Sequence, residues 1–178
     1  MGKEILETHR LLLREMDQED FRPLAAMLQD AKVMTAYEHT FSHSEVGIWL
    51  GAQMMRYVRD GFGLWAVVLK KTGEMVGQCG ITWQQWEERT VPEIGYLLRY
   101  NHCHNGYATE AAMACREYAF DELDFGEVFS IIRENNYASQ KVARRMGMEE
   151  RGEFVKHYYG IDMPHIVFSV RSATMVKQ

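Results

Sequence analysis

The sequence predicts an α/β (α+β) fold, a mixed antiparallel and parallel central sheet of about six to seven strands flanked by about four helices. Two observations support this prediction. Several strand-like segments precede the central helix, which favours antiparallel pairing at the front of the sheet. Residues 92–99, the helix after them and residues 127–133 then form a strand, helix and strand, which implies a parallel crossover. With 178 residues, the chain is long enough for a single domain, predicted over 1–178.

The first elements follow from alternation and helix caps. Residues 6–16 alternate around Leu11 and Leu13 and are predicted to be one strand. Asp17 can cap the following helix, with Asp20 three residues on, and that helix should include residues 21–28. Residues 30–43 have no periodicity. An apolar stripe returns in residues 44–60, and Gly61 should end this second helix.

The middle and end of the chain are strand-rich. Residues 64–70 and 75–83 form a predicted hairpin around Thr72-Gly73, and the polar residues 84–90 are predicted to be a loop before the strand 92–99. After the central helix, which begins near Ala108, residues 127–133 read as a short strand and residues 136–147 as a helix. Residues 149–159 and 163–172 should close the fold as a hairpin.

The turn before the central helix has the properties of an anion site. Its loop ends in Gly106 and Ala108, so no bulky side chain shields the backbone there. The first amides of a helix lack partners, and they lie at the positive end of the helix dipole. The three glycines of a dinucleotide fingerprint and the Lys-Ser or Lys-Thr of a P-loop are both missing. A phosphorylated cofactor of another kind is therefore predicted.

Two longer patterns resemble a known family. Glu-Ile-Gly-Tyr-x-Leu at 93–98, followed by Gly-Tyr-Ala-Thr-Glu-Ala at 106–111, resembles the acetyl-coenzyme A motif of the GNAT superfamily of N-acetyltransferases, in particular the branch that acetylates the N-terminal amine of ribosomal proteins. The segment from Asn136 to Gly147 resembles the second GNAT motif, in which Asn-x-x-Ser opens a helix that ends in glycine. Cys103 stands where Gln or Arg is usual, and His104 where this branch often has glycine.

The resemblance implies the GNAT acyl-CoA N-acyltransferase fold and acetyl-CoA as cofactor, with coenzyme A as product. In this family the two parallel strands splay apart, and the pantetheine arm of the coenzyme lies between them. The loop between the first two helices walls the substrate cleft, which makes Tyr37 and Phe41 candidates for binding the acceptor, and Trp83 is a third. The alternative is that Tyr37 and Phe41 pack the helix pair, and packing explains Trp83 equally well. The implied cofactor-binding residues are Leu97, Leu98, Cys103, His104, Asn105, Gly106, Tyr107, Ala108, Thr109, Asn136 and Ser139.

The implied chemistry needs a proton acceptor, because an aliphatic amine is mostly protonated near pH 7. Glu93 is the first candidate, acting directly or through water; the alternative is a structural acid paired with an arginine. A backbone amide near Leu97 or Leu98 would stabilise the oxyanion. Ser139 would donate to the departing thiolate, although Asn136 and Ser139 could instead serve only as a helix cap and a first-turn residue. No step needs a covalent enzyme intermediate, so Cys103 is not read as a nucleophile.

Composition limits the partners. A formal net charge of −5 gives no basic footprint for nucleic acid. No apolar run approaches the length of a membrane span, so no membrane partner is expected. The histidines of His102-x-His104 lack a third ligand, so no metal site is predicted, and three cysteines without paired spacing suit a reducing cytoplasm.

The expected enzyme is a cytoplasmic acetyl-CoA-dependent N-acetyltransferase, a monomer or homodimer, that acts on a primary amine of a peptide or protein N-terminus or of a small molecule. An aminoglycoside-type antibiotic acetyltransferase and a non-catalytic CoA-binding or interaction module on the same fold stay open as alternatives.

Overall fold

The computed structural model describes residues 2–173; residues 1 and 174–178, which the predicted domain includes, lie outside that range. Within it, eight strands form one sheet in the order β1-β2-β3-β4-β5-β6-β8-β7, at least one more than predicted. The strands are β1 (Glu4–Glu7), β2 (Leu11–Arg14), β3 (Leu64–Leu69), β4 (Met75–Trp86), β5 (Arg89–Leu98), β6 (Glu127–Arg133), β7 (Glu149–Tyr158) and β8 (Ile161–Arg171). The helices are α1 (Phe21–Leu28), α2 (His43–Asp60), α3 (Tyr107–Asp121) and α4 (Tyr137–Arg145), with short 3-10 turns at Gln18–Asp20, Met34–Tyr37 and Tyr100–His102.

The N-terminal segment is a hairpin, so the prediction of one strand over residues 6–16 was wrong. β1 pairs antiparallel with β2, and a turn at residues 8–10 separates them. Thr8 holds that turn, since its amide donates to the carbonyl of Leu11 at 2.9 Å and its hydroxyl oxygen accepts from the Leu11 amide at 3.0 Å. The alternation runs through both strands, and it therefore hides the turn.

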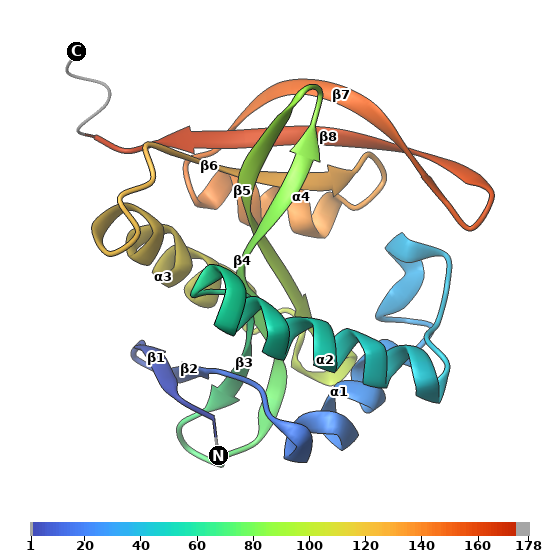
Figure 1. Ribbon diagram of the computed structural model, residues 1–178, viewed down its shortest axis with the longest axis vertical. Helices are drawn as coiled ribbons and strands as arrows, with labels where there is room; N and C mark the ends of the chain where they lie inside the picture. The colour runs from blue at the N-terminus through green and yellow to red at the C-terminus, as the bar shows by residue number, and fades with distance from the viewer. Residues whose placement is uncertain (1, 174–178) are drawn as a thin grey trace.

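The predicted loop at residues 84–90 is also wrong, because β4 and β5 extend through it. Gln85 pairs with Thr90 and Trp86 with Arg89, which leaves Glu87 and Glu88 as the two-residue turn. Glu87 has a φ of 53°, the left-handed conformation that such hairpin turns require. The polar residues here belong to a ribbon that projects beyond the neighbouring strands (Figure 1), so they remain hydrated while their backbone pairs.

The strand pairing changes from antiparallel to parallel between β5 and β6, as predicted. These strands are parallel, and Glu93 with Phe129 is the one register pair between them. By contrast, β4 and β5 pair along ten positions, and β6 and β8 along seven. β5 and β6 therefore separate beyond Glu93. We call this gap between β5 and β6 the seam.

Helices cover both faces of the sheet (Figure 1). Leu24, Leu28, Val46 and Leu50 of α1 and α2 pack in one buried cluster with Ala66 and the start of β4. Ala111 and Cys115 of α3 belong to a second cluster with β4, β5 and β6. The predicted caps support these helices: Asp17 and Asp20 form a capping box before α1, and Gly61 ends α2 with a φ of 79°. The seam lies in the sheet, between the two helical layers.

Candidate active site

The N-terminus of α3 is open, as the sequence predicted. Gly106 occupies the N-cap with a φ of 80° and no side chain caps the helix there. The first intrahelical bond runs from the Glu110 amide to the Gly106 carbonyl at 3.0 Å, so the amides of residues 107–109 have no partner within the helix. His104 has a φ of 64°, and the Asn105 carbonyl accepts from Arg10 at 2.9 Å. This turn presents backbone donors and a nearby cation, which fits an anionic group.

Arg10 is a residue that the sequence interpretation missed. Its guanidinium forms an ion pair with Glu110 at 2.7 Å and lies 4.6 Å from the centre of the Tyr107 ring. An ideal Cβ on Gly106 would lie 3.4 Å from its Nη2. Arg10 thus joins the β1–β2 turn to the first turn of α3 and fixes the loop between residues 102 and 107. The sequence offers no signal for this contact, because the two segments are far apart in the chain.

The other side of the seam is built by the start of α4. Asn136 is its N-cap, and its side-chain oxygen accepts from the Ser139 amide at 3.2 Å. The capping alternative for Asn136 is therefore part of its role. The Tyr96 hydroxyl of β5 donates to the Ser139 carbonyl at 2.7 Å, and burial raises the pKa of Tyr96, which keeps that donor protonated. Tyr96 ties α4 to β5 across the seam, a contact that the sequence did not reveal.

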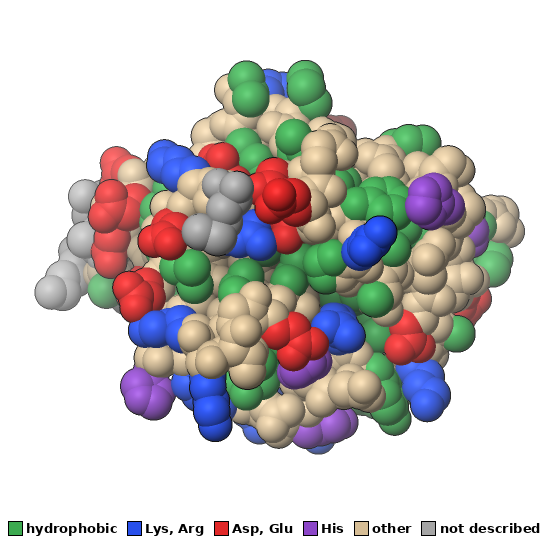
Figure 2. All heavy atoms as spheres, turned by 90° about the horizontal axis from the view of Figure 1, so that it is seen from below, with side chains coloured by type: hydrophobic (Ala, Val, Ile, Leu, Met, Phe, Trp, Pro, Cys, Tyr) green, Lys and Arg blue, Asp and Glu red, His purple; other side chains and the backbone are tan. Residues whose placement is uncertain are grey.

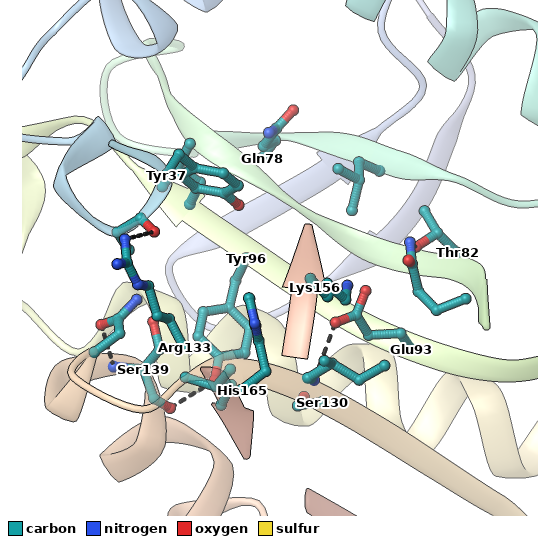
Figure 3. Close-up of a pocket in the computed structure, with 18 of the residues that line it drawn as sticks. Tyr37, Gln78, Thr82, Glu93, Tyr96, Ser130, Arg133, Ser139, Lys156 and His165 are labelled. Carbon is teal, nitrogen blue, oxygen red and sulfur yellow. Dashed lines mark hydrogen bonds between the residues drawn. The ribbon is translucent and has the colours of Figure 1, made fainter. Parts of the chain in front are cut away.

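A cavity of about 440 Å³ opens on the α1–α2 face of the sheet, beside the seam. Its size is in the range of small-molecule sites. It brings together six predicted site residues, namely Tyr37, Phe41, Glu93, Leu97, Asn136 and Ser139, of which Figure 3 labels Tyr37, Glu93 and Ser139. Further lining side chains that the sequence did not single out include Arg56, Gln78, Thr82, Arg133, Lys156, Tyr159 and His165. The predicted loop residues 103–109 are not part of this lining.

The structure does not bring Trp83, a predicted acceptor-binding residue, into this cavity. Thr82 and Gln84 line the cavity, and Trp83 between them points to the opposite face of β4. There its ring packs against Phe62 and Phe125, with centroids 5.6 Å and 5.4 Å away. Thr82 is the β4 residue opposite Glu93. Neighbouring residues of this strand therefore have different environments: Thr82 lines the cavity, and Trp83, the next residue, packs on the opposite face.

Aromatic rings close the outer end of the cavity. Tyr37 and Phe41 come from the segment between α1 and α2, and Tyr158 and Tyr159 come from the tip of the β7–β8 hairpin. His39 stacks on Tyr159 with ring centroids 4.1 Å apart, which joins the two segments. This contact joins the segment between α1 and α2 to the β7–β8 hairpin, and both segments contribute lining residues to the cavity.

Glu93 stands at the seam, where β5 and β6 make their one pair. Its Oε1 accepts from the Ile131 amide at 3.0 Å, and the Ser130 hydroxyl donates to the Ile94 carbonyl at 2.8 Å. Among residues 2–173, no arginine, lysine or histidine nitrogen forms an ion pair with Glu93 within 4.0 Å. Burial raises the pKa of Glu93, against the lowering effects of Lys156, the Ile131 amide and Arg56. A partly desolvated carboxylate facing a cavity can accept a proton.

A Glu93→Gln variant is expected to be more stable than the wild type at pH 8. Because burial raises the pKa of Glu93 above its ordinary 4.5, the folded protein keeps a proton that the unfolded chain has released. Stability therefore falls as pH rises from 4.5 through the folded pKa, and the charge cost is fully present above it. Glutamine removes that charge and still accepts from the Ile131 amide.

Urea unfolding followed by circular dichroism at pH 8 and at pH 4 measures this effect. The extra free energy of unfolding of Glu93→Gln should be present at pH 8. It should shrink at pH 4, because there Glu93 is mostly protonated in the unfolded chain as well as in the folded protein. Glu88→Gln, in the exposed β4–β5 turn, is the control and should change little at either pH. A Glu93→Gln protein that is less stable than the wild type at pH 8 contradicts the desolvated environment of this acid.

Backbone alternation identifies which amides of β5 face the seam. The Arg99 amide donates to Val76 of β4 at 2.8 Å, and the Ile94 carbonyl faces β6. Since successive residues of a strand direct their backbone groups to opposite sides, the amide of Leu97 faces β4 and those of Tyr96 and Leu98 face the seam. Of the two amides predicted as candidates to stabilise the oxyanion, those of Leu97 and Leu98, only the Leu98 amide faces the seam. The Tyr96 amide, which was not predicted, faces it as well.

Comparison with known proteins is consistent with this geometry. The sequence profile of the acetyltransferase (GNAT) domain family matches residues 10–149. The chain belongs to the GNAT family. The matched range includes the open α3 N-terminus, the seam and α4. It ends at the first residue of β7, so the β7–β8 hairpin that carries Lys156 and Tyr159 lies outside the part that this GNAT profile describes.

Relatives of this GNAT chain include YkkB of Bacillus subtilis, an uncharacterized protein, which is 41% identical over 148 residues, 83% of this chain and 86% of YkkB. An acetyltransferase structure from Agrobacterium tumefaciens has a TM-score of 0.79 and 26% identity, and covers 94% of each chain. A RimL ribosomal L7/L12 alpha-N-protein acetyltransferase in complex with coenzyme A has a TM-score of 0.77 at 17% identity, over 95% of this chain and 98% of that one. These comparisons establish an acyl-CoA-dependent acetyltransferase of the GNAT family.

No helix in residues 2–173 is long and apolar enough to cross a membrane. On the face that Figure 2 shows, acidic and basic side chains are interspersed, so the net charge of −5 is not gathered into a field of one sign there.

Proposed function

We propose that this GNAT enzyme transfers the acetyl group of acetyl-CoA to a primary amine by direct attack in a ternary complex. The observation that carries the proposal is the position of Glu93 at the seam, where it faces a cavity shared with Ser139. The acceptor amine would enter from the aromatic end of the cavity, and the coenzyme from the open N-terminus of α3. The amine belongs to a peptide or protein N-terminus or to a small molecule.

The residues present fit the coenzyme. The amides of residues 107–109 and the Arg10 guanidinium suit the pyrophosphate, because a helix N-terminus with free donors stabilises an anion. The seam leaves the backbone of β5 open to hydrogen bonds beyond Glu93. Cys103 and His104 replace the usual side chains of the GNAT motif. The Cys103 amide donates within its own turn to Tyr100 at 3.1 Å, so the amides of residues 107–109 remain the main donors.

The chain's own groups would then act in sequence. Glu93 accepts a proton from the amine, directly or through water. The Leu98 amide, directed into the seam, stabilises the negative charge that develops on the carbonyl oxygen. The Ser139 hydroxyl donates to the departing thiolate. Burial raises the pKa of the Cys103 thiol, so it stays protonated and suits a neutral loop position better than a nucleophile.

A Ser139→Ala variant tests this arrangement. It should bind acetyl-CoA with wild-type affinity in isothermal titration while kcat, measured by thiol release, falls by about a hundredfold or more, because one positioned proton donor contributes about 10²–10⁴-fold. The backbone carbonyl that accepts from Tyr96 is unaffected by the change. Ser44→Ala, a first-turn serine of α2, is the matched control and should retain both affinity and kcat.

The outcomes separate the remaining alternatives. Loss of acetyl-CoA binding in Ser139→Ala would place Ser139 in coenzyme recognition and not in proton transfer. A wild-type protein that binds acetyl-CoA but releases no thiol with any amine would be a coenzyme-binding module on a GNAT scaffold. A wild-type protein that does not bind acetyl-CoA would mean that Cys103 and His104 have removed the pyrophosphate site.

A further inference from the structure

The charges around the cavity are mainly positive, although the chain carries a net charge of −5. Arg56, Arg133 and Lys156 line it, and Glu93 is its one lining carboxylate. Burial lowers the pKa of His165, so this lining residue is neutral above its ordinary pKa of 6.5. The cavity is therefore a poor site for a polycation, which would meet three cations and a single carboxylate.

The three cations differ in their partners. Arg133 is engaged in the structure, since it donates to the Ala36 carbonyl at 3.1 Å and pairs with Glu38. It holds the 3-10 turn at Met34–Tyr37 against β6. Among residues 2–173, Arg56 and Lys156 form no ion pair within 4.0 Å. Lys156 contacts the rings of Phe154 and Tyr158, 5.6 Å and 5.8 Å from its Nζ.

Arg56 and Lys156 reach the cavity from different elements. Arg56 comes from the last turns of α2, and Lys156 comes from β7. Their charges both act on Glu93, and Figure 3 shows Lys156 beside that carboxylate. Arg56 is partly buried, and the charges of Asp60 and Glu93 act on it without forming an ion pair within 4.0 Å, so its partly desolvated guanidinium would gain from a directly bonded anion. An anion from a ligand would supply the missing partner.

We propose that the acceptor is a small amine that carries its own carboxylate, and that Arg56 and Lys156 bind this carboxylate while the amine faces Glu93. One acid flanked by two cations is complementary to a zwitterion, which has one ammonium and one carboxylate. The inference rests on the proposed acetyl transfer and narrows its acceptor. A free amino acid and the acidic N-terminal residue of a peptide share this chemistry, and a cavity of about 440 Å³ limits either to a small group.

Matched ligand pairs test the proposal by binding, without turnover. The protein saturated with coenzyme A is titrated calorimetrically with amino acids of graded side-chain size and with the corresponding amino alcohols, in which CH2OH replaces the carboxylate. A second arm compares dipeptides that begin with Asp or Glu with those that begin with Asn or Gln. In at least one arm the anionic ligand should bind at least about tenfold more tightly, because it gains charge-assisted hydrogen bonds.

Variants connect that preference to the two cations. Arg56→Met and Lys156→Met should each reduce the acid-to-neutral affinity ratio by about tenfold, the loss of one charged contact. Lys71→Met, in the exposed β3–β4 turn, makes the same change in net charge and should leave the ratio unaltered. A variant that is generally destabilised weakens binding of both ligands of a pair to the same extent. That common loss cancels in the ratio, so it does not imitate the expected effect.

Each result decides the question. A preference confined to free amino acids or to acidic dipeptides identifies the source of the carboxylate. Equal binding of both members of every pair overturns the inference, as does a preference that survives both Met variants or tighter binding of polyamines and aminoglycosides. Acetyl transfer to neutral amines with no acid preference would overturn the inference and leave the proposed function intact. Acid-selective binding without any thiol release would support the carboxylate site and contradict the proposed acetyl transfer.

Discussion

A Gly106→Glu variant is expected to lose at least about a hundredfold in affinity for coenzyme A, because a like charge placed beside the pyrophosphate costs several kcal/mol. Two features of the structure lead to this expectation. Gly106 has a φ of 80°, which side-chain-bearing residues rarely adopt, and the new side chain would start 3.4 Å from Arg10 Nη2. Its carboxylate would therefore compete with the ligand for the same cation and the same amides.

Isothermal titration of coenzyme A measures the loss, and two further variants separate its causes. Gly73→Glu has the same charge and the same left-handed strain, at a φ of 71° in the β3–β4 turn with open space around it, and should bind like the wild type. Gly106→Ala introduces strain without charge and should give an intermediate affinity. Wild-type affinity in Gly106→Glu would show that the coenzyme does not use this helix terminus.

A Glu93→Gln variant is expected to lower kcat by about 10²–10⁴-fold, the usual contribution of a positioned general base. Glutamine has nearly the same shape and retains the acceptor for the Ile131 amide, so the seam should keep its geometry. The affinity for acetyl-CoA should therefore remain that of the wild type. The variant removes the group that takes the proton and leaves the binding surfaces in place.

The pH dependence provides the independent readout. In the wild type, kcat/KM should fall as pH decreases through the raised pKa of Glu93, because the protonated acid cannot accept a proton. This limb should be absent in Glu93→Gln, in which only the titration of the amine remains. Glu88→Gln again serves as the control. An unchanged pH profile in Glu93→Gln would assign the proton to another group, and Glu93 would then be a structural acid of the seam.

The helices and the open turn before α3 could be predicted because local chemistry determines them. Gly61 and Gly106 adopt positive φ at the ends of helices, and Asp17 and Asn136 occupy N-caps where short polar side chains are preferred. These signals depend on neighbours within four residues. The parallel crossover, with Glu93 on its first strand, could be predicted for a different reason, namely the order of strand, helix and strand along the chain.

The sequence could not predict which side chains of β4 face the cavity, because the first eight residues of that strand are all buried. Without an alternation of polar and apolar positions, nothing distinguishes Thr82, which lines the cavity, from Trp83, which packs on the other face. Arg56 and Lys156 were missed for another reason. They meet only after α2, β5 and β7 have assembled, and an unpaired cation has no signature in a linear sequence.

The seam has a mechanical consequence. It leaves the sheet as two continuous halves, β1 to β5 and β6 to β8, that share one backbone pair. Glu93 belongs to the first half, and Ser139 follows the first strand of the second. A rotation of one half against the other about the Glu93–Phe129 pair would change the width of the seam beyond Glu93, where the Tyr96 hydroxyl reaches Ser139. The Tyr96 hydroxyl, the Ser130 hydroxyl and the Glu93 carboxylate bridge the seam by side-chain hydrogen bonds, and Arg133 joins β6 to Ala36 and Glu38. Whatever fills the gap consequently acts as a spacer that sets the width of the seam beside Ser139.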